Sequence, residues 1–133
     1  MEYINNTKVY KNLVSRDTQR THMYTEKLEL LEKYLIEEYQ KLITSFESYT
    51  KHDWTHTINV LNYMYDLLDD PSKFTEEDLM LMIFTALLHD IGMAWSTNEV
   101  KILLPNVNQD EKITEIIRVK HGEFAEIKIN KMV

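Results

Sequence analysis

Apolar residues recur at helical spacing through most of this 133-residue chain, with charged and polar residues between them. From Tyr24 to Ser48 the apolar positions lie three, four or seven residues apart, which is typical of one long amphipathic helix. The members of this stripe are Leu28, Leu31, Leu35, Leu42 and Phe46. A second stripe predicts a helix from about Trp54 to Leu68, with Asp53 as its N-cap and Asp69-Asp70-Pro71 at its end.

A third predicted helix is apolar on almost every side. It opens at Thr75-Glu76-Glu77-Asp78, which resembles a capping box, and it contains the ten-residue apolar run from Leu79 to Leu88. We expect such a helix to be central and buried. Residues 94 to 109, with a proline and several asparagines, are expected to form an irregular connection. A further helix is predicted from Asp110, with an interruption at Gly122.

These patterns together predict an all-α fold, because the sequence shows no sustained strand-like alternation, no internal repeat and no low-complexity stretch. A length of 133 residues and 44% hydrophobic composition suit one compact domain. Residues 1–23 are polar, weakly periodic and comparatively basic. They are therefore set apart as an N-terminal segment of unpredicted order, and the helical domain is assigned to residues 24–133.

Composition limits the chemistry that the chain can perform. The absence of cysteine excludes disulfides, thiolate zinc sites, iron–sulfur clusters and a cysteine nucleophile, and leaves histidine and carboxylate as metal ligands. The N-terminus does not resemble a signal peptide, and the longest apolar run is shorter than the ~20 residues that cross a bilayer. We therefore expect a cytoplasmic protein that does not bind a membrane. A net charge of −7 also disfavours non-specific binding to nucleic acid.

A candidate metal site follows the apolar run directly, at His89-Asp90-Ile91-Gly92. His56 lies 33 residues earlier and His121 lies 32 residues later, so other helices would supply them. Consecutive helical side chains point about 100° apart, so His89 and Asp90 reach one ion only beyond the helix end. A buried carboxylate needs a cation, an arginine or a hydrogen-bonding helix end. The pattern favours a metal site over a hydrogen-bonded His-Asp pair without metal.

Three segments resemble the HD-domain metal-dependent phosphohydrolases, whose pattern is a histidine, then a His-Asp pair, then a distant aspartate. Tyr49–Leu61 is similar to the first histidine segment of that family, and Ala86–Met93 is similar to its His-Asp helix. Arg118–His121 resembles an Arg-x-x-His element found in some members. The segments are most similar to HD domains at the N-terminus of larger bacterial proteins, some of which carry Hsp90-like ATPase modules. The resemblance implies an HD-like helical bundle.

The resemblance also implies roles for individual residues. A divalent ion (Mn, Fe, Co, Ni, Zn or Mg) would be bound by His56, His89 and Asp90, and His121 would help to hold a second ion. His89 and Asp90 would be the catalytic residues, because the ion that they hold activates water for attack on phosphorus. Substrate-binding roles are expected for Arg118, His52 and Lys51. For Arg118 a salt bridge to a neighbouring acid is an equal alternative.

The chain departs from the family pattern at two places. No aspartate follows Asp110, so the family's last aspartate is missing and the bundle is expected to be incomplete at its C-terminus. Met93 stands where relatives that cleave cyclic dinucleotides have a lysine, which disfavours that activity.

Two functions are therefore expected. The first is a metal-dependent phosphohydrolase acting on a nucleotide or related phosphate ester. The alternative is a non-catalytic HD module that binds a ligand or partner and regulates a larger assembly. The expected partners are a small phosphorylated ligand and, because the 28–46 stripe is long, either a second copy of the chain or the rest of a larger multidomain protein.

Overall fold

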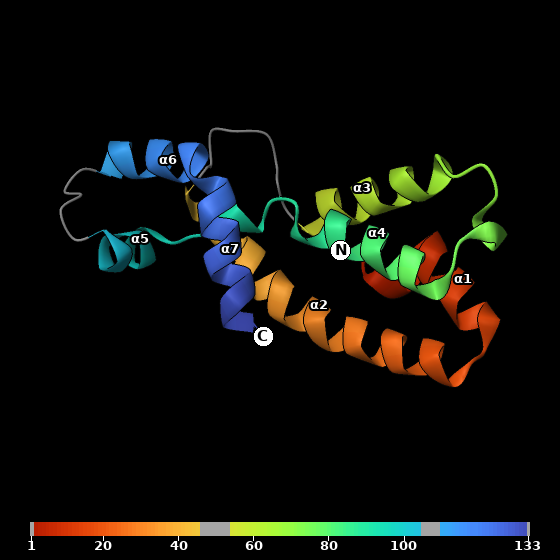
Figure 1. Ribbon diagram of the computed structural model, residues 1–133. Coiled ribbons are helices and arrows are strands. Elements are labelled where there is room, and N and C mark those ends of the chain that lie inside the picture. The colour runs from red at the N-terminus through yellow and green to blue at the C-terminus, as the bar shows by residue number, and fades with distance from the viewer. Residues whose placement is uncertain (1, 46–53, 105–109, 133) are drawn as a thin grey trace. The chain divides into compact units, whose positions relative to one another are not determined.

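Figure 1 shows a computed structural model of the chain, which describes residues 2–45, 54–104 and 110–132. All regular structure in these ranges is helical, so the all-α prediction is confirmed. The α-helices are α1 (Lys8–Arg16), α2 (Gln19–Ser45), α3 (Trp54–Asp66), α4 (Glu76–Leu88), α5 (Thr97–Leu103), α6 (Asp110–Val119) and α7 (His121–Met132). The 3-10 helices are η1 (Ile4–Asn6), η2 (Pro71–Lys73) and η3 (Ile91–Met93). Among the described helices, none has the length and apolar character needed to cross a membrane.

The chain divides into two compact units. The first unit contains Met1–Ile36 and Trp54–Leu87, and therefore holds η1, α1, the first part of α2, α3 and most of α4. The second unit contains Glu37–Asp53 and Leu88–Val133, and therefore holds η3 and α5 to α7.

The N-terminal segment, whose order the sequence leaves open, is folded against the rest of the first unit. Its fully buried apolar side chains are Ile4, Val9 and Leu13. The Lys8 ammonium lies 2.6 Å from an Asp66 carboxylate oxygen, and the Asn12 amide donates to the Tyr65 hydroxyl over 3.0 Å. Both contacts join α1 to α3. Residues 4–16 thus form an ordered part of the fold.

Helix α2 begins at Gln19 and so includes the end of the segment that sequence patterning left unassigned. Leu28 and Leu35 of the predicted stripe are buried, whereas the side chain of Leu42 and all of Phe46 lie outside the described residues. The Tyr10 hydroxyl in α1 donates to Glu29 in α2 over 2.8 Å. Burial and this contact raise the pKa of Tyr10 to about 12.

The predicted capping box of α4 is confirmed. The Asp78 backbone N–H donates to the Thr75 hydroxyl over 3.1 Å, and the Thr75 N–H donates to the Asp78 carboxylate over 3.0 Å. The expectation that α4 is central and buried holds for one face only, because Leu81 is 68% exposed and Phe84 is 38% exposed. These two side chains line an open groove of about 530 Å³ between α2 and α4, in the first unit. Only one face of the helix is covered there.

Replacing Thr75 by Ala should lower the free energy of unfolding by about 1 kcal/mol, because the Asp78 amide loses its capping acceptor. Urea unfolding of the variant and the parent measures this difference. Thr85→Ala is the matched control, since Thr85 lies exposed within the same helix and its hydroxyl bonds only back to the Leu81 carbonyl. Equal destabilisation by the two substitutions would contradict a capping role for Thr75.

The second unit corrects two predictions. The connection predicted to be irregular from 94 to 109 contains α5, which opens with a capping box between Ser96 and Glu99. The Glu99 N–H donates to the Ser96 hydroxyl over 3.2 Å, and the Ser96 N–H donates to Glu99 over 3.0 Å. The interruption predicted at Gly122 falls instead at Lys120, between α6 and α7.

A buried lysine holds α7 within the second unit. The Lys128 side chain is 3% exposed, forms an ion pair with Glu38 of α2, and lies 3.4 Å from Glu99 of α5. Its ammonium also lies 5.0 Å from the centre of the Trp95 ring, which packs on Phe124 with ring centres 4.8 Å apart. These contacts fix α7 beside the segment that follows η3, and they place Trp95 in the core of the unit.

Candidate metal centre

His56 lies in the first turn of α3. The helix begins at Trp54, as the sequence predicts, while the predicted N-cap Asp53 lies outside the described residues. Trp54, Thr57 and Ile58 are buried, and His56 is half-buried. The His56 imidazole therefore extends from a helical turn that is packed into the first unit.

His89 and Asp90 lie just beyond the last residue of α4, which ends at Leu88. Asp90 has φ −109° and ψ 8° and precedes η3. Because the backbone has left the helix, the two consecutive side chains can face the same point, and His89 Nε2 lies 3.0 Å from Asp90 Oδ2. The Asp90 side chain is 15% exposed and that of His89 is 32% exposed. The sequence places the pair on the last turn of the helix, whereas the structure places it just after that turn.

Gly92 in η3 allows α7 to approach closely, and its own backbone conformation is not unusual. Its φ is not positive, and the residue is buried. A Cβ atom at this position would lie 1.7 Å from the His121 carbonyl oxygen and 2.9 Å from the Ala125 amide nitrogen. The start of α7 therefore packs directly on the backbone of η3, the segment that follows Asp90.

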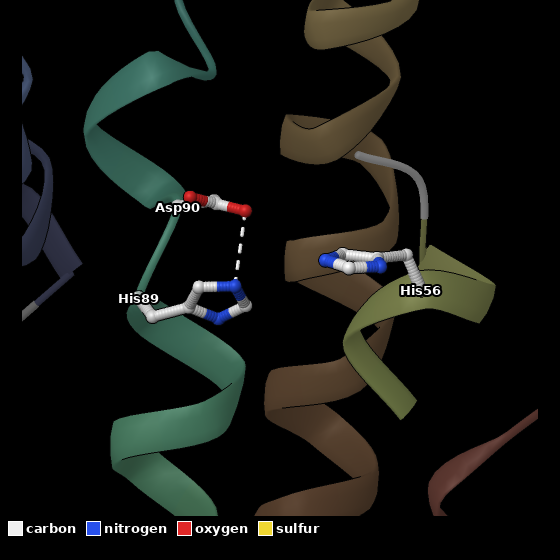
Figure 2. A group of neighbouring side chains, drawn as sticks. All are labelled: His56, His89 and Asp90. Carbon is white, nitrogen blue, oxygen red and sulfur yellow. Dashed lines mark ion pairs between the residues drawn. The ribbon is translucent and has the colours of Figure 1, made fainter. Parts of the chain in front are cut away.

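His56, His89 and Asp90 form one group, in which each residue offers a ligand atom within 4.8 Å of the others. Figure 2 shows the three side chains turned toward a common point, with His56 coming from α3 and the His-Asp pair from the end of α4. The 3.0 Å between His89 Nε2 and Asp90 Oδ2 is the separation of an ion pair and also that of neighbouring ligands on one ion with bonds of about 2.1 Å. Two imidazoles and one carboxylate are ligand types that suit a divalent transition metal.

His121 is not a member of this group. Its Nδ1 lies 2.7 Å from the Arg118 carbonyl oxygen, so Nδ1 donates there and Nε2 remains the acceptor that a metal would use. Arg118 lies 3.7 Å from Glu115 in an exposed i, i+3 pair, which is the salt bridge considered for it. A second-ion role for His121 and a phosphate-binding role for Arg118 stay predictions. Lys51 and His52 lie outside the described residues.

Residues 46–130 match the family model HD-CE, which covers almost two thirds of the chain. The chain belongs to the HD-CE family. This family is related to the HD domains, so the resemblance to HD domains is confirmed, while the likeness to those at the N-terminus of larger proteins stays a prediction. The HD-CE match includes His56, His89 and Asp90 of the candidate metal-binding group. It begins after the end of α2 and so omits η1, α1 and α2. Comparisons with curated proteins and with solved structures found no match.

Glu32 was not predicted from the sequence as a residue of interest. Glu32 of α2 is buried and accepts a hydrogen bond from the Trp54 indole, two residues before His56. Its only sequence signal is its register, because it follows Leu28 by four positions and precedes Leu35 by three. Those spacings place a carboxylate on the apolar face of the helix, where a satisfied partner is required.

Proposed function

We propose that this HD-CE chain is a metal-dependent phosphohydrolase that acts on a nucleotide or related phosphate ester. The observation that carries the proposal is the group of His56, His89 and Asp90, in an order and spacing that resembles the HD phosphohydrolases. When bound, a divalent ion supplies Lewis-acid activation of water and of a phosphoryl oxygen. A cytoplasmic location is part of the proposal.

The three residues would contribute to the binding of such an ion in different ways. His56 and His89 offer neutral imidazole nitrogens, and Asp90 supplies the negative charge that offsets part of the ionic charge. The Asp90 side chain is 15% exposed, so its carboxylate sits in surroundings that strengthen attraction to a cation. The His89 side chain, at 32% exposure, leaves the group accessible to a phosphate from solvent.

Activity should depend on added metal. We expect chelator-treated protein to release no phosphate from nucleoside mono-, di- and triphosphates or from p-nitrophenyl phosphate. Reloading with Mn²⁺, Fe²⁺, Ni²⁺ or Zn²⁺ should restore release, and Asp90→Asn should reduce it by at least about a hundredfold. Phosphate release is measured colorimetrically over the panel, with matched protein and metal concentrations.

Phosphate release, measured together with ligand binding, distinguishes the phosphohydrolase from the alternative function. Among the described residues the group contains one carboxylate, which favours a module that binds a ligand without hydrolysing it. Stoichiometric metal and nucleotide binding by calorimetry, without phosphate release, would establish that regulatory role. A parent chain that binds no metal would contradict the phosphohydrolase and leave the non-catalytic module, whose ligand or partner would then be sought.

A further inference from the structure

Glu32 is a buried carboxylate in the middle of α2. The residue is 8% exposed. One of its oxygens, Oε2, accepts a hydrogen bond from the Ile4 backbone N–H over 2.6 Å and another from the Trp54 indole Nε1 over 3.1 Å. Neither donor carries a charge. Ile4 has no exposed surface and Trp54 is 3% exposed, so both hydrogen bonds are shielded from solvent.

These two hydrogen bonds join segments that are distant in the sequence. Ile4 belongs to η1, and Trp54 is the first residue of α3, in the same turn as His56. All of these residues lie in the first unit. A single carboxylate oxygen thus connects the N-terminal segment to the turn that presents a metal ligand.

The choice of residue at this position points beyond simple packing. Burial of a carboxylate is unfavourable even when it is hydrogen-bonded, and an apolar side chain of similar volume would fill the same space at lower desolvation cost. Residues that orient a ligand set metal affinity in many proteins, although they never touch the ion. Glu32 bonds the indole of Trp54, two residues before His56, and can therefore act on His56 through the first turn of α3.

We propose that Glu32 is a positioning residue for His56. By holding the Trp54 indole and the Ile4 amide, it fixes the first turn of α3 and so keeps the imidazole in the metal-binding group. The proposal rests on the proposed function, because it assigns a role in metal binding. It also makes the N-terminal segment, which lies outside the HD-CE match, a determinant of metal affinity.

Glu32→Gln is the first test, because glutamine keeps the shape and an acceptor oxygen but removes the charge. We expect the Mn²⁺ affinity of the variant, measured by titration calorimetry, to fall about tenfold. In the metal-free protein, the Trp54 indole N–H should exchange with solvent faster, as followed by NMR. Trp95 is the chain's other tryptophan and serves as the reference signal in the same spectrum.

A double-mutant cycle tests whether Glu32 acts through Trp54. Trp54→Phe removes the indole donor while retaining an aromatic ring in the core. If Glu32 acts on His56 through Trp54, the double variant should bind Mn²⁺ no more weakly than whichever single variant has the lower Mn²⁺ affinity. Lys8→Ala is the matched control, since it breaks an exposed contact between α1 and the other end of α3 and should leave the affinity unchanged.

Two results would overturn the proposal: parental Mn²⁺ affinity in a folded Glu32→Gln variant, or effects of Glu32→Gln and Trp54→Phe that multiply independently. If the parent chain binds no metal, the proposed function fails. The coupling is then decided by the metal-free spectra. Faster Trp54 exchange and a shifted His56 ring signal in Glu32→Gln would support it, and unchanged signals would exclude it.

Discussion

Replacing Asp90 by Asn should lower the affinity for Mn²⁺ or Zn²⁺ by more than about a hundredfold, because even residues that only orient ligands contribute 10–100-fold. The substitution preserves the size of the side chain and removes the only charged ligand of the group. A neutral amide oxygen binds a transition metal far more weakly than a carboxylate does. Titration calorimetry on chelator-treated protein gives both affinity and stoichiometry. We expect one ion per chain in the parent, with additional binding if His121 holds a second ion.

The chain contains its own matched control for this substitution. Asp17 and His22 form another His-Asp pair, with His22 Nε2 2.7 Å from Asp17 Oδ1, and both side chains are more than two thirds exposed. Among the described residues, only the group with His56 brings three ligand atoms together. Asp17→Asn should therefore leave metal affinity unchanged. Equal losses from Asp17→Asn and Asp90→Asn would mean that binding is diffuse and not located at the HD pair.

Metal binding should also appear as a gain in stability. At a free metal concentration about 100 times Kd, binding to the folded state adds about 2.7 kcal/mol to the free energy of unfolding. For a chain of this size that corresponds to a rise in Tm of about 10 °C. The rise should be absent in Asp90→Asn and in His56→Ala. A metal-induced rise that persists in both variants would place the bound ion elsewhere.

Local patterns in the sequence predicted the parts of the fold that depend on neighbours along the chain. The Thr75 capping box and the start of α3 at Trp54 were found because a cap and its helix lie within a few residues. The same signal was present at Ser96 and Glu99, but a proline and several asparagines nearby favoured an irregular connection. The His-Asp pair was recognised for the same reason, since an apolar run that ends in two ligands is a local feature.

Features that depend on distant contacts were not predictable from patterning. The register of Glu32 places it on the apolar face of α2, but its partners Ile4 and Trp54 lie 28 residues before and 22 residues after it in the chain, so the sequence does not reveal them. The exposure of Leu81 has the same origin, because an apolar run does not reveal which of its faces another element covers. The need for glycine at position 92 also has this origin, because the atoms that a Cβ would meet belong to α7.

Gly92→Ala should be the most destabilising small substitution in the second unit. The added Cβ would lie 1.7 Å from the His121 carbonyl oxygen, 2.6 Å from the His121 carbonyl carbon and 2.9 Å from the Ala125 amide nitrogen. All three are backbone atoms, so no rotation of a side chain relieves the overlap, and η3 and α7 must separate. We expect a loss of about 3 kcal/mol or more in the free energy of unfolding, at the upper end of the range for overpacking.

The chain's other glycine provides the control. Gly122 lies in the first turn of α7, and a Cβ at that position would meet no atom within 4 Å. Gly122→Ala should therefore raise the free energy of unfolding by up to about 1 kcal/mol, through improved helix propensity. Urea unfolding of the two variants should thus give changes of opposite sign. Equal tolerance of both substitutions would contradict the packing of η3 on α7.

The consequence of Gly92→Ala should extend to the metal centre, because Asp90 is two residues from the strained position. A variant stabilised in low urea or at low temperature should remain helical by circular dichroism and yet bind Mn²⁺ at least about tenfold more weakly, as expected when support behind a ligand is displaced. Gly122→Ala should retain parental affinity. Parental affinity in folded Gly92→Ala would show that the His-Asp pair keeps its geometry without the contact between η3 and α7.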